Sequence, residues 1–187
     1  MKTKMVLLYA LILAILAVVL PLINIPLTIG NPNLGSTPAT LAAIYLPWPL
    51  GIIIALIKGI AASIITGRPW VELPAGIGDA FMALFTFWMA KHMHKAWATV
   101  LGQASRIIFT SGVVALCISI AVSLNLLTPA TAPITGLTSS LFPDIGISWL
   151  SITFPAIILS IVVNTIFSLI IVLLFSRLIE NSLKKGT

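Results

Sequence analysis

The segment Pro49–Gly67, PLGIIIALIKGIAASIITG, is apolar almost throughout, yet it carries Lys58 near its centre. A run of about 17 to 25 apolar residues is long enough to cross the hydrocarbon core of a bilayer as an α-helix. Several such runs lie along the chain, whereas strands of a membrane barrel would show alternation over about ten residues. The sequence therefore predicts a helical membrane protein with a charged side chain inside one span.

The composition of the whole chain agrees with this class. Of the 187 residues, 59% are hydrophobic and 7% are charged, whereas about 25% of residues are charged in soluble domains. The mean hydropathy is +1.18. A chain of this length has room for about five to seven spans, so we expect a single transmembrane domain over residues 1–187 and no separate catalytic or nucleotide-binding domain.

Six helices are expected, separated by segments that hold most of the proline, glycine and asparagine. Their ranges are 5–23, 37–48, 50–66, 73–91, 103–127 and 148–178. The second range is short for a span. The LPWPLG sequence after it is either a tight turn between two short helices or a kink within one. The long segment between the last two helices is either a binding loop or a plain connector.

The distribution of basic residues favours six helices with both termini in the cytoplasm. The loop sequences NIPLTIGNPNLGST and TPATAPITGLTSSLFPDIG then lie outside and contain no Lys or Arg, as the positive-inside rule requires. With five helices, the loops after LPWPLG would lie on the opposite sides of the membrane, and the positive-inside rule would no longer be satisfied. The net charge of +6 is thus read as a topology signal and not as a nucleic-acid surface. Eight basic residues fall inside and Arg68 falls outside; the inner set is Lys2, Lys4, Lys91, Lys95, Arg106, Arg177, Lys184 and Lys185.

Small residues mark one face of three helices, where a neighbouring helix can approach closely. In the first helix they are Ala10, Ala14 and Ala17, which we interpret as a docking face, internal or external. In the third helix, Lys58 lies on the small-residue face and therefore points at protein. Asp79 lies on the corresponding face of the fourth helix, with Glu72 above it near the outer end.

Lys58 and Asp79 lie at similar depths, roughly 12 Å and 9 Å from the outer ends of their helices. An unpaired ion at such a depth costs several kcal/mol, so we expect a salt bridge or a watery cavity there. Two interpretations stay open: the pair only joins two helices, or it lines a polar cavity. The last helix carries a polar stripe with the same two interpretations, formed by Thr153, Ser160, Asn164 and Ser168.

Motifs for other functions are missing from the sequence. His92 and His94 lie beside three cations without a nearby Cys or carboxylate, so no metal site is expected. There is no P-loop, no G-x-S-x-G and no H-E-x-x-H, and we expect neither an enzyme nor a cofactor.

A six-helix membrane protein with an alanine stripe on helix one and two long outer loops free of Lys and Arg resembles the substrate-binding S components of energy-coupling factor (ECF) transporters. The sequence Ala10-Leu-Ile-Leu-Ala14 looks like the A-x-x-x-A motif by which that family contacts its T component. Residues 45–67 and 73–93 are similar to the third-helix entry and small-residue fourth helix of many S components. The resemblance covers nearly the whole chain.

This resemblance implies a multi-pass protein of a prokaryotic cell membrane that captures a vitamin or related micronutrient from outside. Its partners would be a transmembrane T component and two ATPase subunits, and the docking residues would be Ala10, Ala14 and Ala17. The ligand-site residues are chosen by helix face and depth, not by a family motif. They are Lys58, Asp79 and Asn164, with Arg68 and Glu72 near the mouth and Trp70 or Trp149 stacking on a ring.

Two other functions remain open at this point. A secondary transporter or channel would use Lys58 and Asp79 as an ion or proton relay, although no inverted repeat is visible. A membrane assembly factor would have side chains filling the outer cavity.

Overall fold

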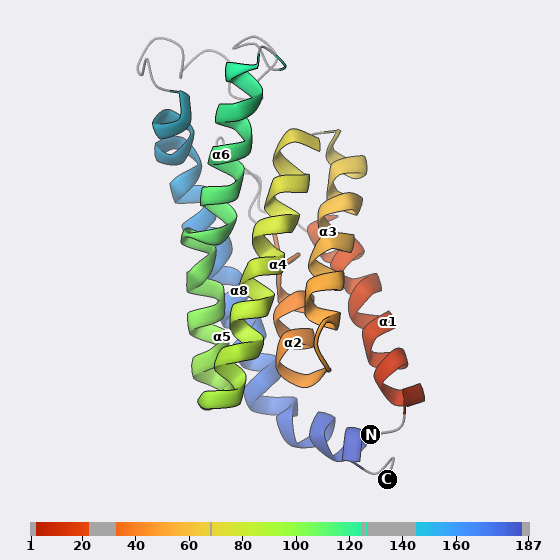
Figure 1. The fold of residues 1–187 in the computed structure, drawn as a ribbon. Helices are drawn as coiled ribbons and strands as arrows, with labels where there is room; N and C mark the ends of the chain where they lie inside the picture. The colour runs from red at the N-terminus through yellow and green to blue at the C-terminus, as the bar shows by residue number, and fades with distance from the viewer. Residues whose placement is uncertain (1–2, 23–32, 68, 125, 127–144, 185–187) are drawn as a thin grey trace.

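The computed structural model describes residues 3–22, 33–67, 69–124, 126 and 145–184. In these ranges the chain forms a bundle of α-helices (Figure 1). The elements are α1 (Thr3–Val19), continued by the 3-10 turn Leu20–Leu22, α2 (Thr37–Tyr45), α3 (Leu50–Thr66), α4 (Pro69–His92), α5 (Lys95–Ala104), the 3-10 turn Ser105–Ile107, α6 (Phe109–Ser123) and α8 (Ile145–Lys184).

The predicted all-α membrane bundle is confirmed, and each expected range overlaps a helix of the described residues. Among the described residues, four segments are long and apolar enough to cross a membrane: Thr3–Leu22, Pro69–His92, Lys95–Ile118 and Ile157–Ser182. The 17-residue helix α3 is also apolar. The fifth helix begins at Lys95, earlier than the expected residue 103, and it is interrupted by the turn Ser105–Ile107.

Helix α2 is too short to cross a bilayer. Its nine residues span about 14 Å at 1.5 Å per residue, roughly half of the hydrocarbon core. Figure 1 shows α2 beside the lower half of α3, so that its first turn lies at mid-height in the bundle. The expected helix 37–48 is therefore a half-crossing, because the chain leaves helical geometry at Leu46, just before Pro47 and Pro49.

Glycine residues allow α3 and α4 to pack backbone against backbone. A Cβ atom on Gly59 would lie 2.7 Å from the Cα atom of Gly76, which is closer than real Cβ atoms approach. Gly78 makes a similarly tight contact with the backbone of Thr110 on α6. Because Gly59 and Gly78 adjoin Lys58 and Asp79 in sequence, these contacts bring both charged residues into the centre of the bundle.

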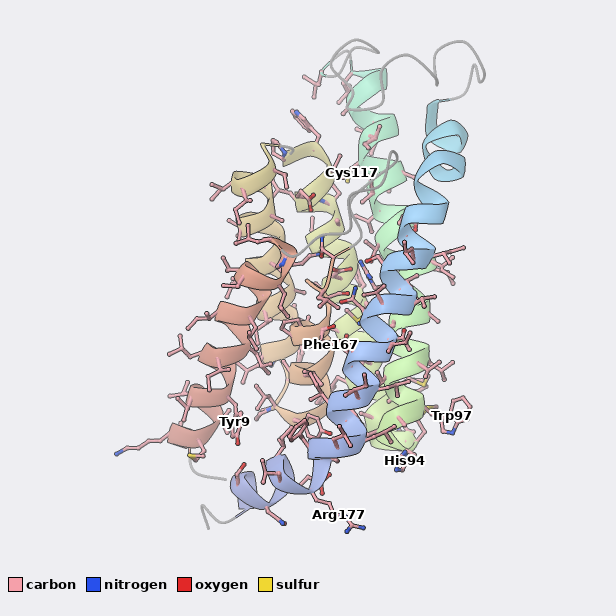
Figure 2. The ribbon with its side chains drawn as sticks, turned by 180° about the vertical axis from the view of Figure 1, so that it is seen from behind. Tyr9, His94, Trp97, Cys117, Phe167 and Arg177 are labelled. Carbon is pink, nitrogen blue, oxygen red and sulfur yellow. The ribbon has the colours of Figure 1, made fainter. Side chains whose placement is uncertain are left out.

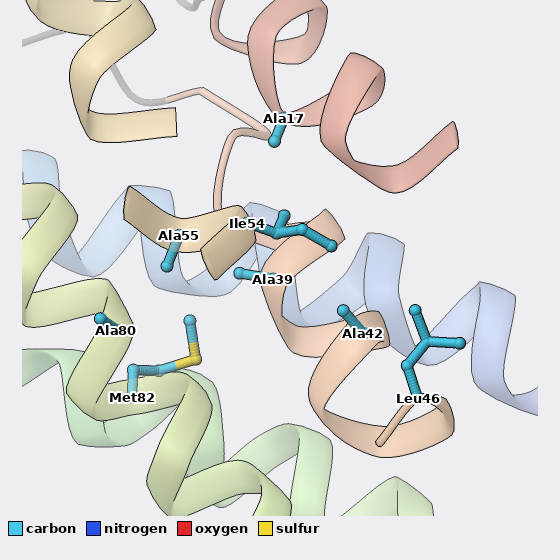
Figure 3. Packing of buried hydrophobic residues seen from close by; sticks show 8 residues of the cluster. All are labelled: Ala17, Ala39, Ala42, Leu46, Ile54, Ala55, Ala80 and Met82. Atoms are coloured by element: carbon cyan, nitrogen blue, oxygen red, sulfur yellow. The ribbon is translucent and has the colours of Figure 1, made fainter. Parts of the chain in front are cut away.

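The apolar core beside this centre is built largely from small side chains. Helices α1, α2, α3 and α4 all contribute to one cluster, drawn in Figure 3. Its buried members are Ala17, Ala39, Ala42, Leu46, Ile54, Ala55, Ala80 and Met82. Alanine on several facing helices lets their backbones approach closely, as in other membrane bundles.

The start of α1 and the end of α8 lie at one end of the bundle, which we call the terminal end (Figure 1). Helix α8 bends there, and its last turns run below α2 toward α1 (Figures 1 and 2). The Tyr9 hydroxyl and Ser182 Oγ are 2.7 Å apart, and Lys95 forms an ion pair with Glu180. His94, Trp97 and Arg177 lie at the same end (Figure 2). This placement agrees with an even number of passages between the two ends.

Candidate functional site

Three charged side chains from different segments meet in the interior. The Lys58 Nζ atom donates to Asp79 Oδ2 at 2.6 Å, so the predicted salt bridge is confirmed. Arg106 Nε donates to the other carboxylate oxygen, Oδ1, at 3.0 Å. Thr110 Oγ1 donates to Oδ1 at 2.7 Å. We call Lys58, Asp79 and Arg106 the ion cluster.

The ion cluster is almost completely enclosed. Asp79 is 0% exposed, Lys58 is 4% exposed and Arg106 is 6% exposed. Removing one partner from a buried ion pair costs about 3–5 kcal/mol, because the other charge stays behind without compensation. The carboxylate of Asp79, bonded on both oxygens, therefore holds α3, α4 and the turn Ser105–Ile107 together.

Arg106 was expected at the cytoplasmic surface, and that expectation is wrong. The helix that leads to Arg106 begins at Lys95, eleven residues earlier, which places Arg106 about 16 Å above the terminal end. Trp97 provides the sequence signal that could have shown this. An aromatic residue at the membrane interface, followed by continuous helical turns, puts the ninth residue beyond it deep in the bundle.

A second group of polar side chains surrounds Asn164 on α8. The Asn164 Oδ1 atom accepts hydrogen bonds from Thr37 N at 3.0 Å and Thr37 Oγ1 at 2.9 Å. Its Nδ2 atom donates to the carbonyl oxygens of Asn33 at 2.6 Å and Ser160 at 2.7 Å. Arg106 Nη1 donates to Ser160 Oγ at 3.2 Å and so joins this group to the ion cluster.

The start of α2 is the point where these groups converge. The Thr37 N–H at the first turn of α2 is bound by Asn164, which caps the helix from another part of the chain. Gln103 Nε2 donates to Thr40 Oγ1 at 2.7 Å, one turn further along α2. A Cβ atom on Gly35 would lie 3.1 Å from Lys58 Cε, so the chain before α2 runs against the lysine. A helix that begins inside a membrane bundle is typical of binding sites in transport proteins.

The structure brings three of the seven predicted site residues into one hydrogen-bonded network: Lys58, Asp79 and Asn164. Glu72 is partly buried and forms no ion pair with a described residue, and Trp70 is 48% exposed. Arg68 and the side chain of Trp149 lie outside the described part of the chain. Sequence reasoning missed three members of this network: Arg106, Thr110 and Thr37. Arg106 and Thr110 bind Asp79, and Thr37 binds Asn164, and in each case the two partners lie far apart along the chain.

The alanine stripe of α1 packs largely inward. Ala17 is 0% exposed within the core cluster, so its methyl group is not available to a partner protein in this structure. Ala10 and Ala14 are partly buried against the same cluster. This face of α1 therefore contacts other helices of the same chain, which is one of the two interpretations left open by the sequence.

A shallow cavity near the α2–α3 turn is too small for an organic ligand. It lies between that turn and α4, is lined by Leu46, Trp48 and Phe87 among others, and has a volume of about 10 Å³. Such a volume holds about one water molecule. The polar network around the start of α2 is therefore the better candidate for function.

Comparison with solved structures identifies the fold. The chain superimposes on a solved structure described as "Structure and mechanism of the S component of a bacterial ECF transporter" with a TM-score of 0.66. The match covers 98% of this chain and 99% of the other, at 22% sequence identity. No family model and no curated protein matches the sequence. The chain thus has the fold of an ECF S component, as the sequence resemblance implied.

Proposed function

We propose that this protein is the substrate-binding S component of an ECF-type importer and captures a small organic micronutrient from outside the cell. The observation that carries the proposal is the end-to-end match to an S-component fold. Because one fold can host several functions, the proposal also needs a site. The polar network that joins α2, α3, α4, α8 and the turn Ser105–Ile107 supplies one.

The proposed binding residues are Lys58, Arg106 and Asn164, with Asp79 as the group that positions both cations. Polar groups are expensive inside a membrane and usually mark a substrate or ion pathway. Helix α2 ends at the terminal end and begins at mid-height, so its first turn faces the half of the bundle that would open to the outside. Glu72 and Trp70, near the start of α4, and Arg68 and Trp149 stay candidates for the mouth.

Under this proposal the protein takes energy for transport from partners. A transmembrane T component and two ATPase subunits would bind at the membrane, with Ala10 and Ala14 as the proposed contact on α1. These residues keep partial exposure. The terminal end, with its basic residues, would face the cytoplasm.

The alternative of an autonomous carrier with a Lys58–Asp79 relay is less consistent with the contacts. A relay residue must exchange its proton or ion, but Asp79 is fully buried and bonded to Lys58, Arg106 and Thr110. Two cations hold it as a fixed carboxylate. Such an arrangement favours a structural anion over a group that moves charge.

The test uses purified protein without partners or ATP. Native mass spectrometry of gently extracted protein should detect one bound small molecule per chain. Liposomes that contain the protein alone should show no gradient-driven uptake of that molecule. Uptake without an ATPase would favour the carrier, and a chain that binds no small molecule would refute the S-component assignment.

A further inference from the structure

The ion cluster carries more positive than negative charge. Two cations, Lys58 and Arg106, share the single carboxylate of Asp79, which leaves one positive charge unbalanced among the described residues. All three side chains are at most 6% exposed. An uncompensated charge in a low-dielectric interior is strongly unfavourable, so such a surplus persists where a further negative group completes the cluster.

The described acidic residues do not supply that group. The sequence has four acidic residues: Glu72, Asp79, Asp144 and Glu180. Glu180 pairs with Lys95 at the terminal end, and within the described ranges neither Glu72 nor Glu180 lies within 4 Å of Lys58 or Arg106. Asp144 lies outside the described residues and is addressed by the experiment below.

Both cations have donors left for another partner. An ammonium group can donate three hydrogen bonds, and in the described part of the chain Lys58 donates one, to Asp79. Arg106 uses Nε and Nη1, for Asp79 and Ser160, which leaves Nη2 for another acceptor. Asp79 is completely covered, whereas both cations keep a small exposed surface. A ligand that approaches the cluster therefore contacts Lys58 or Arg106 before it contacts Asp79.

The start of α2 adds positive potential at the same place. The first turn of a helix carries a partial positive charge, equivalent to roughly half a unit. Gly35, two residues before Thr37, lies against the Lys58 side chain, so this end of α2 adjoins the ion cluster. An anion here would meet Lys58, Arg106 and the helix end together.

We propose that the ligand of this site carries one carboxylate, which binds Lys58 and Arg106 beside the start of α2 and neutralises the surplus charge of the ion cluster. This inference rests on the proposed function, because it assumes a ligand site. A single carboxylate restores neutrality, whereas a phosphate monoester, with about two negative charges, would reverse the sign.

The experiment begins with the molecule that co-purifies with the protein, identified by native and tandem mass spectrometry. In parallel, thermal shift and calorimetry compare matched acids and neutral analogues: nicotinate with nicotinamide, pantothenate with pantothenol, and biotin with its methyl ester. We expect the bound molecule to be a carboxylic acid and its neutral analogue to bind about 10- to 100-fold more weakly, as loss of hydrogen bonds to charged groups predicts.

Variants then locate the carboxylate. Lys58→Met should lower affinity for the acid about 10- to 100-fold and leave affinity for the neutral analogue nearly unchanged. Lys4→Met, the same substitution at an exposed position on α1, is the matched control and should change neither. If Lys58→Met lowers affinity for the acid and its neutral analogue equally, Lys58 does not bind the carboxylate and the inference is wrong.

Other outcomes separate this inference from the proposed function. A neutral, cationic or phosphorylated ligand would refute the carboxylate and leave the S component intact. If Asp144 already balanced the cluster, the wild-type protein would bind the neutral analogue at least as well as the acid, which also refutes it. Absence of any bound molecule, both after purification and with all six probes, would count against the function itself.

Discussion

Arg106 Nη1 donates a hydrogen bond to Ser160 Oγ, and this single contact connects the ion cluster of α3 and α4 with the amide network of α8. Through it, a change at Asp79 can reach Asn164 and the first turn of α2 over a short chain of contacts. The two polar groups therefore behave as one unit that spans five elements, and each of the following predictions perturbs a defined part of it.

Asp79→Asn should destabilise the fold more than any other single change in the ion cluster. The substitution leaves Lys58 and Arg106 buried without a counter-charge, at a cost of about 3–5 kcal/mol. Thermal melting in detergent, followed by size-exclusion chromatography, measures the effect. Glu72→Gln, a partly buried position on the same helix without an ion pair to a described residue, is the control and should melt close to the wild type.

Lys58→Met should fold. Asp79 keeps Arg106 and Thr110, so the variant has one balanced ion pair in place of a cluster with surplus charge. The cost of about 3–5 kcal/mol for breaking a buried ion pair arises from the charge left without compensation, and here Arg106 still compensates Asp79. We expect a melting temperature within a few degrees of the wild type. A protein that no longer folds would mean that Lys58 serves only to join α3 and α4.

Asn164→Ala should loosen the start of α2. The Thr37 Oγ–H group loses its acceptor, and leaving a buried donor unsatisfied costs about 1–3 kcal/mol. The Thr37 N–H group keeps only its longer bond to the Leu34 carbonyl oxygen, at 3.2 Å. Hydrogen exchange measured by mass spectrometry should become faster in residues 37–41 than in α3. Asn181→Ala, at an exposed position near the end of α8, provides the control. Unchanged exchange at α2 would show that Asn164 does not hold this helix end.

Gly59→Ala should weaken the contact between α3 and α4, since the added methyl group would lie 2.7 Å from Gly76 Cα. Alanine is otherwise the better helix former by about 1 kcal/mol. Gly112→Ala on α6 isolates that effect, because no atom lies within 4 Å of its Cβ position. We therefore expect opposite shifts in melting temperature, downward for Gly59 and upward for Gly112. Equal shifts would contradict backbone contact between α3 and α4.

Ala10→Trp should prevent assembly with a T component while the protein still binds its ligand, if Ala10 and Ala14 form the proposed contact. The matched variant is Leu11→Trp, on the neighbouring residue, whose side chain is 59% exposed. Co-purification with tagged partner subunits measures assembly, and calorimetry measures ligand binding. The reverse result, with Leu11→Trp blocking assembly, would move the docking surface to the leucine-rich face of α1.

Hydropathy and helical phase predicted much of this architecture. The apolar runs located the four described segments long enough to cross a membrane, because each must cover the hydrocarbon core, although one of them begins at Lys95 and not at the expected residue 103. The small-residue faces predicted that Lys58 and Asp79 point inward at similar depth, and their salt bridge follows from that placement. Asn164 was placed on an inward stripe by the same reasoning, and in the structure it is fully buried.

The predictions failed where the structure depends on contacts between residues far apart in the sequence, because hydropathy and helical phase describe only neighbouring residues. Residues 95–102 include a lysine and a threonine, and the sequence pattern places them in an inner loop before the expected helix 103–127, with Arg106 as an inner surface charge. The length of α2 could not be read from hydropathy, because Leu46 and Trp48 continue the apolar run beyond the helix end. Asn164 caps Thr37 across 127 residues, and no pattern along the chain encodes that contact.

The salt bridge between Lys58 and Asp79 also bears on how the chain enters the membrane. A lysine or an aspartate at the centre of an isolated helix opposes insertion by about 2.5–3.5 kcal/mol. Helices α3 and α4 are separated by only residues 67–68, so they can enter the bilayer together as a hairpin whose two charges already neutralise each other. Arg106 is synthesised later and reaches a carboxylate that is already paired.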